Sequence, residues 1–200
     1  MIIELCGLPG SGKTTLVKKL DETKLFSIIK VNNKKLVIIN FLRYFLSRPT
    51  ETFRATWWAI MSADSFSHFW NTLFFRYAKY ELAQRGSSKN IVIDEGPFQN
   101  IYSYAKGTDD ISLVKASLEK MPTVSFLILL AIPESLRQQN LVRRVELNPQ
   151  RKNMRTQLKE KQMLDTHQML LELLKNYPNC YIAISVDEAF AYIMKKYGNT

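Results

Sequence analysis

A glycine-rich turn close to the start of the chain has the composition of a phosphate-binding loop. It lies between a strand-like apolar run and an amphipathic helical one, and its sequence, GLPGSGKTT, matches the pattern G-x-x-x-x-G-K-[ST]. Several backbone N–H groups of such a turn point into one concavity, and glycines let phosphate oxygens approach the backbone closely. The predicted phosphate-binding residues are Gly7, Pro9, Gly10, Ser11, Gly12, Lys13, Thr14 and Thr15.

The end of this turn carries side chains with chemistry of their own. Lys13 can bridge the β- and γ-phosphates of a nucleoside triphosphate, and the Thr14 hydroxyl can ligate Mg²⁺. The helix that follows adds its positive N-terminal end. We therefore predict ATP and Mg²⁺ as cofactors, with Lys13 as a catalytic residue and Thr14 as a metal ligand.

An acidic pair at the end of a predicted strand is the second candidate feature. The run NIVID is a strand of the buried type, and its last residue, Asp94, is followed by Glu95 and Gly96. In P-loop proteins a neighbouring strand commonly ends in an acidic residue that reaches the metal or its water shell. We predict this role for Asp94. Glu95 is predicted to act as a general base toward an acceptor hydroxyl or to bind the acceptor, and either residue could be the base.

Positive charge is concentrated late in the chain. The formal net charge is +10, and residues 134–161 include eight basic and three acidic side chains. Such a local cluster fits a polyphosphate site better than a long nucleic-acid track. Phosphoryl transfer needs positive charge around the transferred group and exclusion of water, which an arginine-bearing lid supplies. We predict a lid over residues 137–155, with Arg144 and Arg151 as the preferred phosphate ligands and Arg137 and Arg143 as further candidates.

The order of the predicted elements indicates the fold class. Strands are expected at 1–6, 90–94, 124–132 and 181–185, and a short one at 36–39, where the start of a helix fits as well. Helices are expected at 13–20, 99–104, 134–146, 154–176 and 187–197, and helical patterns rich in aromatic residues run from 41 to 84. Strands that alternate with helices predict an α/β protein, with a parallel sheet covered on both faces, in one domain over residues 1–200.

Taken in this order, the motifs resemble the thymidylate kinase-like branch of the nucleoside and nucleotide kinases over nearly the whole chain. The matching segments are GLPGSGKTT, LFFRYAKYELAQRG with NIVIDEG, FQNIYSYAKG, and ILLAIPESLRQQNLVRR. The resemblance implies a three-layer P-loop NTPase fold with a parallel, roughly five-stranded sheet and a lid over ATP. It also implies that Arg76 points toward the acceptor's phosphate. The helices of residues 41–85 would form the acceptor side, with Phe69 or Trp57 facing the pocket and most other aromatic side chains in the core.

The chain departs from the pattern of that family on the acceptor side. Thymidylate kinases usually carry Asp-Arg, and deoxynucleoside kinases Glu-Arg-Ser, where this chain has Asp94, Glu95 and Gly96; the Arg-Glu-Pro-Gly motif of many thymidylate kinases has no counterpart. The predicted reaction is transfer of the γ-phosphoryl group to a small acceptor, a nucleoside or a nucleoside monophosphate. A kinase for another hydroxyl metabolite is an alternative, and the pI of about 9.6 also suggests a polynucleotide 5′-kinase or another nucleic-acid-acting NTPase.

Other classes of protein fit the sequence less well. A GTPase switch would need a base-reading Asn-Lys-x-Asp segment, and the nearest run, NNKK at 32–35, lacks the aspartate. The two cysteines, Cys6 and Cys180, lie far apart, so neither a disulfide scaffold nor a zinc site is expected, and a reducing compartment is favoured.

The expected surroundings of the protein follow from the same composition. Polar residues interrupt the most apolar stretch, 55–75, so no membrane segment is predicted. We expect a cytoplasmic enzyme whose partners are a nucleotide donor and a small-molecule acceptor. Nucleic acid is not favoured, and the oligomeric state stays open, with a homodimer as one option.

Overall fold

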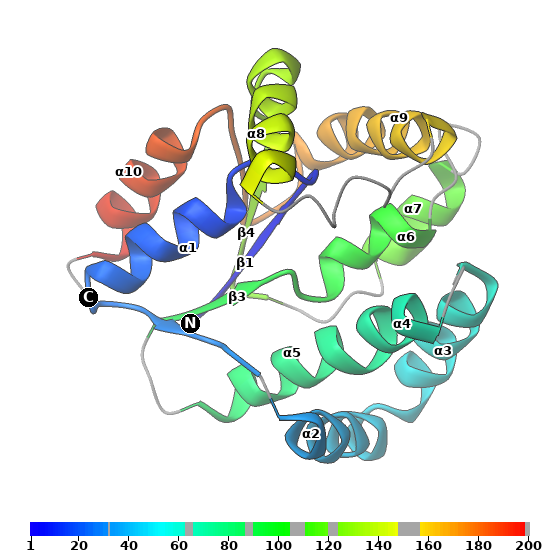
Figure 1. Cartoon of the computed structure of the whole chain (residues 1–200). Helices are drawn as coiled ribbons and strands as arrows, with labels where there is room; N and C mark the ends of the chain where they lie inside the picture. The colour runs from blue at the N-terminus through cyan, green and yellow to red at the C-terminus, as the bar shows by residue number, and fades with distance from the viewer. Residues whose placement is uncertain are drawn as a thin grey trace.

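A five-stranded parallel sheet forms the centre of the molecule (Figure 1). The computed structural model describes residues 1–31, 33–62, 66–86, 90–104, 111–119, 124–147 and 157–198. The strands are β1 (Ile2–Gly7), β2 (Ser27–Ile28), β3 (Ile91–Asp94), β4 (Phe126–Leu130) and β5 (Cys180–Ala183), in the spatial order β2-β3-β1-β4-β5. The predicted α/β class and the parallel sheet are confirmed.

The register of the central strands brings the two candidate motifs together. Leu5 of β1 is aligned with Asp94 of β3, and Gly7 of β1 is aligned with Leu130 of β4. Because all strands run in the same direction, the glycine-rich turn and the acidic pair leave the sheet at the same edge. Ligands of open parallel sheets bind at this carboxyl edge.

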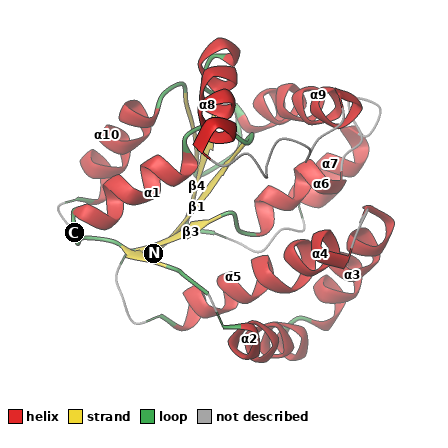
Figure 2. Ribbon diagram, viewed as in Figure 1, coloured by secondary structure: helices red, strands yellow, loops and turns green. Residues whose placement is uncertain are grey.

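Helices cover both faces of the sheet (Figure 2). On one face, Ile3 and Leu5 contribute to a core with apolar residues of α1 (Lys13–Glu22) and α10 (Val186–Tyr197). On the other face, Cys6 contributes to a core with residues of α5 (Arg76–Arg85), α6 (Ile101–Tyr104), α7 (Ile111–Leu118) and α9 (Gln157–Leu174). The alternation of strand side chains therefore turns Glu4 toward the second face.

An outer group of helices packs against α5. It comprises α2 (Lys34–Ser47), α3 (Pro49–Ser62), α4 (Phe66–Phe69) and a π-helical segment, η1 (Trp70–Phe75), that leads directly into α5. Aromatic pairs hold α2 to α5 and η1: the ring centroids of Tyr44 and Tyr77 lie 5.0 Å apart, and those of Phe41 and Phe74 lie 4.4 Å apart. Helix α8 (Glu134–Leu147) stands upright at the end of β4 (Figure 1).

Of the two alternatives predicted at 36–39, the strand is wrong and the helix is confirmed. These residues lie inside α2, which begins after Asn33, whose Oδ1 accepts a hydrogen bond of 2.9 Å from the Lys35 N–H. An asparagine in this position caps a helix and outweighs the β-branched run that suggested a strand. The actual second strand has two residues, and its pairing with β3 rather than its composition identifies it.

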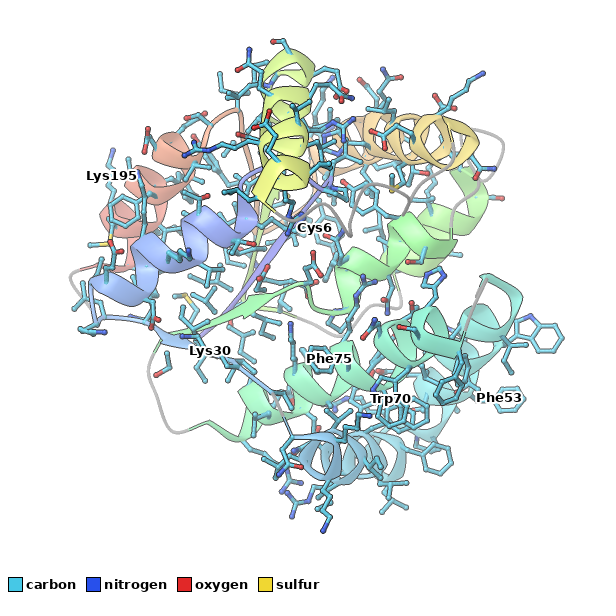
Figure 3. All side chains as sticks on the ribbon, viewed as in Figure 1. Cys6, Lys30, Phe53, Trp70, Phe75 and Lys195 are labelled. Atoms are coloured by element: carbon cyan, nitrogen blue, oxygen red, sulfur yellow. The ribbon has the colours of Figure 1, made fainter. Side chains whose placement is uncertain are left out.

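The aromatic residues of 41–85 are buried less completely than expected. Four of the aromatic residues in described regions are exposed rather than buried, from 42% for Phe45 to 77% for Phe66, with Phe53 and Trp57 between them. Phe53 stands out from α3, whereas Trp70 lies between the helices (Figure 3). The other predicted helices and strands of the described regions are found within a few residues of their expected bounds, and no described helix is long and apolar enough to span a membrane.

Candidate active site

The glycine-rich turn adopts a backbone that requires its glycines. Gly7, Gly10 and Gly12 have φ angles of 151°, 88° and 88°, a region that residues with a Cβ rarely adopt. A Cβ on Gly7 would lie 2.8 Å from the Leu130 carbonyl oxygen. The turn ends at Gly12, where α1 begins, so the N-terminus of α1 opens directly on the turn. This is the geometry expected of an anion site at a helix N-terminus.

Two side chains of α8 hold this turn from outside. Arg137 Nη1 donates to the Pro9 carbonyl oxygen at 3.1 Å, and Asn140 Nδ2 donates to the Gly10 carbonyl oxygen at 2.9 Å. The Arg137 side chain is fully buried and also binds the carboxylates of Glu134 and Glu160. Arg137 was predicted as a candidate phosphate ligand of a mobile lid, but its guanidinium group is already bound to these protein groups. It fixes a peptide group of the turn instead.

Lys13 is buried and folded back onto its own turn. Its Nζ donates to the carbonyl oxygens of Gly7 and Leu8 at 2.7 and 3.2 Å and lies 3.7 Å from a Glu95 carboxylate oxygen. Burial lowers the pKa of Lys13, and the nearby Glu95 charge opposes that effect. Three acceptors thus surround the ammonium group, which has three hydrogens to donate.

The two acidic residues occupy different electrostatic environments. Asp94 Oδ1 is buried without a hydrogen-bond partner among the described residues, and burial together with the Glu95 charge raises the pKa of Asp94. Burial also disfavours ionisation of Glu95, but Lys13, Arg76 and Lys79 outweigh it, so the pKa of Glu95 is lowered. Glu95 has a φ of 57°, an uncommon conformation for a residue other than glycine. Strain of this kind is often retained at functional sites.

Two cations of α5, Arg76 and Lys79, lie near the acidic pair, and both lower the pKa of Glu95. Arg76 Nη1 donates to Asn100 Oδ1, and Asn100 in turn donates from Nδ2 to the Thr72 carbonyl oxygen at 2.9 Å. Lys79, one helical turn after Arg76, donates to the Asp94 carbonyl oxygen. Arg76 was predicted from the resemblance, whereas Lys79 was missed, although its spacing of three residues from Arg76 places both on one helix face.

A buried carboxyl group behind the acidic pair was also missed. Glu4 is fully buried; its Oε1 accepts a hydrogen bond from the Gln99 N–H at 3.3 Å, and its Oε2 has no partner among the described residues. A Cβ on Gly96 would lie 2.7 Å from the Glu4 carboxyl group. Burial raises the pKa of Glu4 to about 8, although hydrogen bonds and nearby cations act against it. The signal in the sequence was a glutamate inside an otherwise apolar strand.

Gln99 joins this carboxyl group to the phosphate-binding turn. Its Oε1 accepts from the Gly7 N–H and its Nε2 donates to the Gly7 carbonyl oxygen, both at 3.1 Å. The same Gly7 oxygen accepts from Lys13. The η2 segment (Pro97–Asn100), which follows the acidic pair, is therefore bonded directly to the first residue of the glycine-rich turn.

The remaining predicted residues are distributed around this centre. Thr14 and Thr15 are exposed in the first turn of α1. Arg144 is exposed near the end of α8, close enough to lower the pKa values of Asp94 and Glu95. Phe69 packs against Phe74, with ring centroids 6.0 Å apart.

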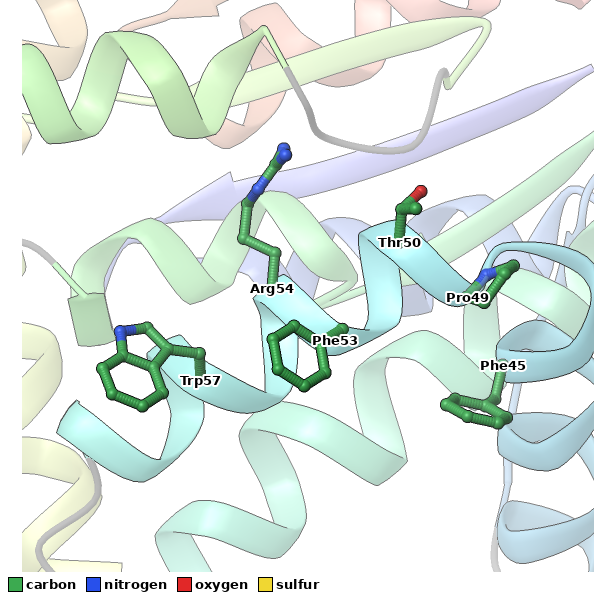
Figure 4. Close-up of a pocket in the computed structure, with 6 residues that line it drawn as sticks. All are labelled: Phe45, Pro49, Thr50, Phe53, Arg54 and Trp57. Carbon is green, nitrogen blue, oxygen red and sulfur yellow. The ribbon is translucent and has the colours of Figure 1, made fainter.

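Two predicted features do not fall inside this site. Arg151 and the second half of the predicted lid, 148–155, lie outside the described residues. Trp57 lies with Phe53 on the exposed side of α3, where both line a hollow together with Phe45 of α2 (Figure 4), so its predicted place in the acceptor pocket is not supported.

The donor set suits a nucleotide-bound magnesium ion. Among the described residues, no group of three or more His, Cys, Asp or Glu could hold a metal by itself. Mg²⁺ is usually bound through one or two protein groups together with substrate phosphates and water. The unpartnered Asp94 Oδ1 is buried at the edge of the sheet where the phosphate-binding turn begins, and Thr14 supplies a hydroxyl beyond that turn.

Comparisons with known proteins identify the fold. No protein-family model matches the chain, and no curated protein matches it in sequence. The deoxyadenosine kinase of M. mycoides, solved with the products dCMP and a flexible dCDP bound, is similar over 100% of both chains, with a TM-score of 0.60 at 13% identity. The thymidylate kinase of Candida albicans is similar over 99% of this chain and 91% of its own, with a TM-score of 0.54 at 14% identity. The predicted P-loop kinase fold is therefore confirmed.

Proposed function

We propose that this protein transfers the γ-phosphoryl group of ATP to a nucleoside or a nucleoside monophosphate, with Mg²⁺ as cofactor. The observation that carries the proposal is the meeting of two half-sites at one edge of the sheet. Lys13 and the glycine-rich turn form the donor half, and Glu95, Arg76 and Lys79 form the acceptor half. The ion pair between Lys13 and Glu95, 3.7 Å long, joins the two halves.

In the donor half, the turn from Gly7 to Thr15 would bind the triphosphate. Its backbone N–H groups and the N-terminus of α1 attract anionic oxygens, and Lys13 would leave its carbonyl partners to bind them. Arg144 would add positive charge from α8. Thr14 and Asp94 would hold Mg²⁺, which neutralises negative charge on the phosphates when it is bound.

In the acceptor half, the two carboxylates suit different tasks. Glu95 is half exposed, and its lowered pKa keeps it ionised at neutral pH, so it can orient or deprotonate an acceptor hydroxyl. Asp94 is more enclosed and better suited to the metal. We therefore assign the base to Glu95.

The acceptor half also contains more positive charge than a neutral acceptor requires. Arg76 and Lys79 lie one helical turn apart, and both lower the pKa of Glu95. A planar guanidinium and an ammonium group in this arrangement suit a phosphate group on the acceptor. The two cations favour a nucleoside monophosphate over a nucleoside.

The wider organisation follows from this assignment. We treat residues 1–200 as one kinase domain, with acceptor-side helices over 41–85 and the predicted lid region over 137–155, in which Arg137 itself is fixed against the glycine-rich turn. Phe69 is retained as an acceptor-side residue on the strength of the resemblance. The two free cysteines, Cys6 and Cys180, agree with a cytoplasmic location.

An acceptor panel tests the proposal. ADP formation from ATP and Mg²⁺ is measured in the presence of nucleoside monophosphates, nucleosides, other hydroxyl metabolites and a 5′-hydroxyl oligonucleotide. We expect stimulation by at least one nucleoside monophosphate or nucleoside. Stimulation by the oligonucleotide alone would replace the proposal with a polynucleotide 5′-kinase, and stimulation by none of the acceptors would contradict it.

A further inference from the structure

The segment that carries the acidic pair rests on a buried carboxyl group of the first strand. We call residues 95–99 of this segment the acidic loop. The Glu4 carboxyl group is fully buried, and its Oε1 accepts a hydrogen bond of 3.3 Å from the Gln99 N–H. Gly96 has an extended backbone with a φ of −86°, but a Cβ there would lie 2.7 Å from the Glu4 Oε2. The closeness of the carboxyl group, and not the backbone conformation, therefore excludes a larger residue at this position.

The Gln99 side chain ties the end of the acidic loop to the glycine-rich turn. Its amide group accepts from the Gly7 N–H and donates to the Gly7 carbonyl oxygen, both at 3.1 Å. The Gln99 residue is 5% exposed, so water does not compete for these two hydrogen bonds. Two hydrogen bonds to one residue fix the orientation of the two segments as well as the distance between them. Gln99 thus binds Glu4 through its backbone and Gly7 through its side chain.

Glu95 itself has a backbone that needs support from its surroundings. Its φ of 57° is uncommon for a residue with a side chain, and such a conformation persists only where neighbouring contacts enforce it. On one side of Glu95, the Asp94 carbonyl oxygen accepts a hydrogen bond from Lys79. On the other side, Gly96 packs on the Glu4 carboxyl group. The position of Glu95 therefore depends on contacts that its own side chain does not make.

We propose that Glu4 and Gln99 are positioning residues, which hold Glu95 at the distance from the glycine-rich turn that phosphoryl transfer requires. This inference rests on the proposed function, in which Glu95 is the base and the turn binds the phosphates. A displacement of about 1 Å between reacting groups can reduce a rate about 100-fold. Neither residue needs to touch a substrate, because Gln99 acts through Gly7 and the backbone of the acidic loop, and Glu4 acts through Gln99.

A carboxyl group suits the position of Glu4 because it can be neutral there. Burial raises the pKa of Glu4 to about 8, so the group is mostly protonated at neutral pH. A protonated carboxyl group still accepts the hydrogen bond from the acidic loop, and it adds no negative charge near the two carboxylates of the acidic pair. Glutamine is neutral and keeps the same acceptor, so it should replace Glu4 in this role. Methionine has a similar size but lacks the acceptor.

Amide hydrogen exchange, followed by NMR, tests these contacts without any measurement of activity. Gln99→Met removes both hydrogen bonds to Gly7, and Glu4→Met removes the acceptor of the Gln99 N–H. Glu4→Gln is the conservative variant. Gln84→Met is the matched control, because the Gln84 side chain also makes two hydrogen bonds, but near the C-terminal end of α5.

The exchange of the Gly7 amide is compared with that of the amides of β4, which lie inside the sheet and report global unfolding. Relative to these, the Gly7 amide should exchange at least about tenfold faster in Gln99→Met and in Glu4→Met. Glu4→Gln and Gln84→Met should stay within about twofold of the wild type. The effect of Glu4→Met is the sharpest result, because Glu4 lies three residues before Gly7 on the same strand and affects it through Gln99. A Gly7 amide that either methionine variant at positions 4 and 99 leaves unchanged, or that the control accelerates equally, overturns the proposal.

Initial-rate kinetics with ATP and a nucleoside monophosphate test the consequence for the reaction. Gln99→Met and Glu4→Met should lower kcat at least about 30-fold, while both KM values stay within about threefold of the wild type, because the groups that bind the substrates are retained. Glu4→Gln should keep kcat within about threefold of the wild type. A contact that only stabilised the fold would not separate kcat from KM in this way.

A double variant shows whether Gln99 acts through Glu95. When Gln99→Met is added to Glu95→Gln, kcat should fall by less than about threefold further, because the group that Gln99 positions is already inactive. Reductions that multiply, or a Gln99→Met enzyme with the kcat of the wild type, overturn the proposal and leave the proposed function intact. A wild type that phosphorylates no acceptor contradicts the proposed function instead, and the exchange of the Gly7 amide then decides whether Glu4 and Gln99 hold the loop to the turn.

Discussion

Replacing the buried Glu4 by glutamine should change how the stability of the protein depends on pH. Burial raises the pKa of Glu4 from its ordinary value of 4.5 to about 8. Between these values the folded protein holds a proton that the unfolded chain releases. The contribution of Glu4 to stability is thus fully present below about pH 4.5 and is lost as the pH rises toward 8. Glutamine has nearly the same shape and no proton to lose.

The expected magnitude follows from the two pKa values. Each pH unit within this range costs about 1.4 kcal/mol of unfolding free energy, so about 5 kcal/mol is the upper bound over the whole range. Between pH 6 and 9 the wild type should lose about 3 kcal/mol that Glu4→Gln keeps. Above pH 8 the variant should therefore be the more stable of the two proteins.

Urea unfolding followed by tryptophan fluorescence at pH 6, 7, 8 and 9 measures this difference directly. The comparison uses the gap between the two proteins at each pH, so groups that titrate in both cancel. A gap that stays constant within about 0.5 kcal/mol from pH 6 to 9 would refute the reasoning that Glu4 is protonated in the folded state.

Three further predictions concern the candidate active site. Asn140→Ala removes the hydrogen bond to the Gly10 carbonyl oxygen and should raise the KM for ATP about fivefold. The control, Gln139→Ala at an exposed neighbouring position, should leave this KM unchanged. Equal KM values in the two variants would contradict the conclusion that α8 holds the glycine-rich turn in place. Glu95→Gln releases Lys13 from its ion pair and should tighten ATP binding in the absence of Mg²⁺ about fivefold, as measured by calorimetry. In the same variant kcat should fall at least about 100-fold. An unchanged affinity for ATP would argue against the ion pair. Arg76→Met should raise the KM for a nucleoside monophosphate at least about tenfold in initial-rate kinetics and leave the KM for ATP nearly constant. An equal increase in both KM values would count against the assignment of Arg76 to the acceptor side.

The sequence predicts the shape of the glycine-rich turn well because that shape depends on local backbone geometry. A turn with glycines at positions 7, 10 and 12 can be recognised without any knowledge of the rest of the chain. The position of Asp94 at this edge was also predictable, since parallel strands end at the same edge of a sheet and its strand is clearly apolar.

Long-range contacts account for what the sequence did not predict. Gln99 binds Gly7 across 92 positions of the chain, and Arg137 binds Pro9 across 128. No local pattern distinguishes these two side chains from solvent-exposed polar residues. Arg137 also shows that the charge of a segment does not reveal its role, because two carboxylates and a carbonyl oxygen hold it inside the protein.

The misassigned strand has a different cause. β-Branched residues suit both a strand and the apolar side of a helix, and the polar cap at Asn33 decided between the two. The exposed apolar residues of α2, such as Leu42 and Leu46, show the same ambiguity at the level of packing. Apolar residues predict burial, but they do not say whether the same chain or a partner covers them.

The most direct test of the central claim is the mass of the acceptor after reaction with ATP and Mg²⁺. Mass spectrometry of a nucleoside monophosphate incubated with the wild type should show a product heavier by one phosphoryl group, and ADP should form in equal amount. Lys13→Ala should reduce the rate of this product's formation at least about 1,000-fold while the protein stays folded. ADP without a phosphorylated acceptor, or equal rates for the wild type and Lys13→Ala, would contradict the proposal that the two half-sites carry out phosphoryl transfer.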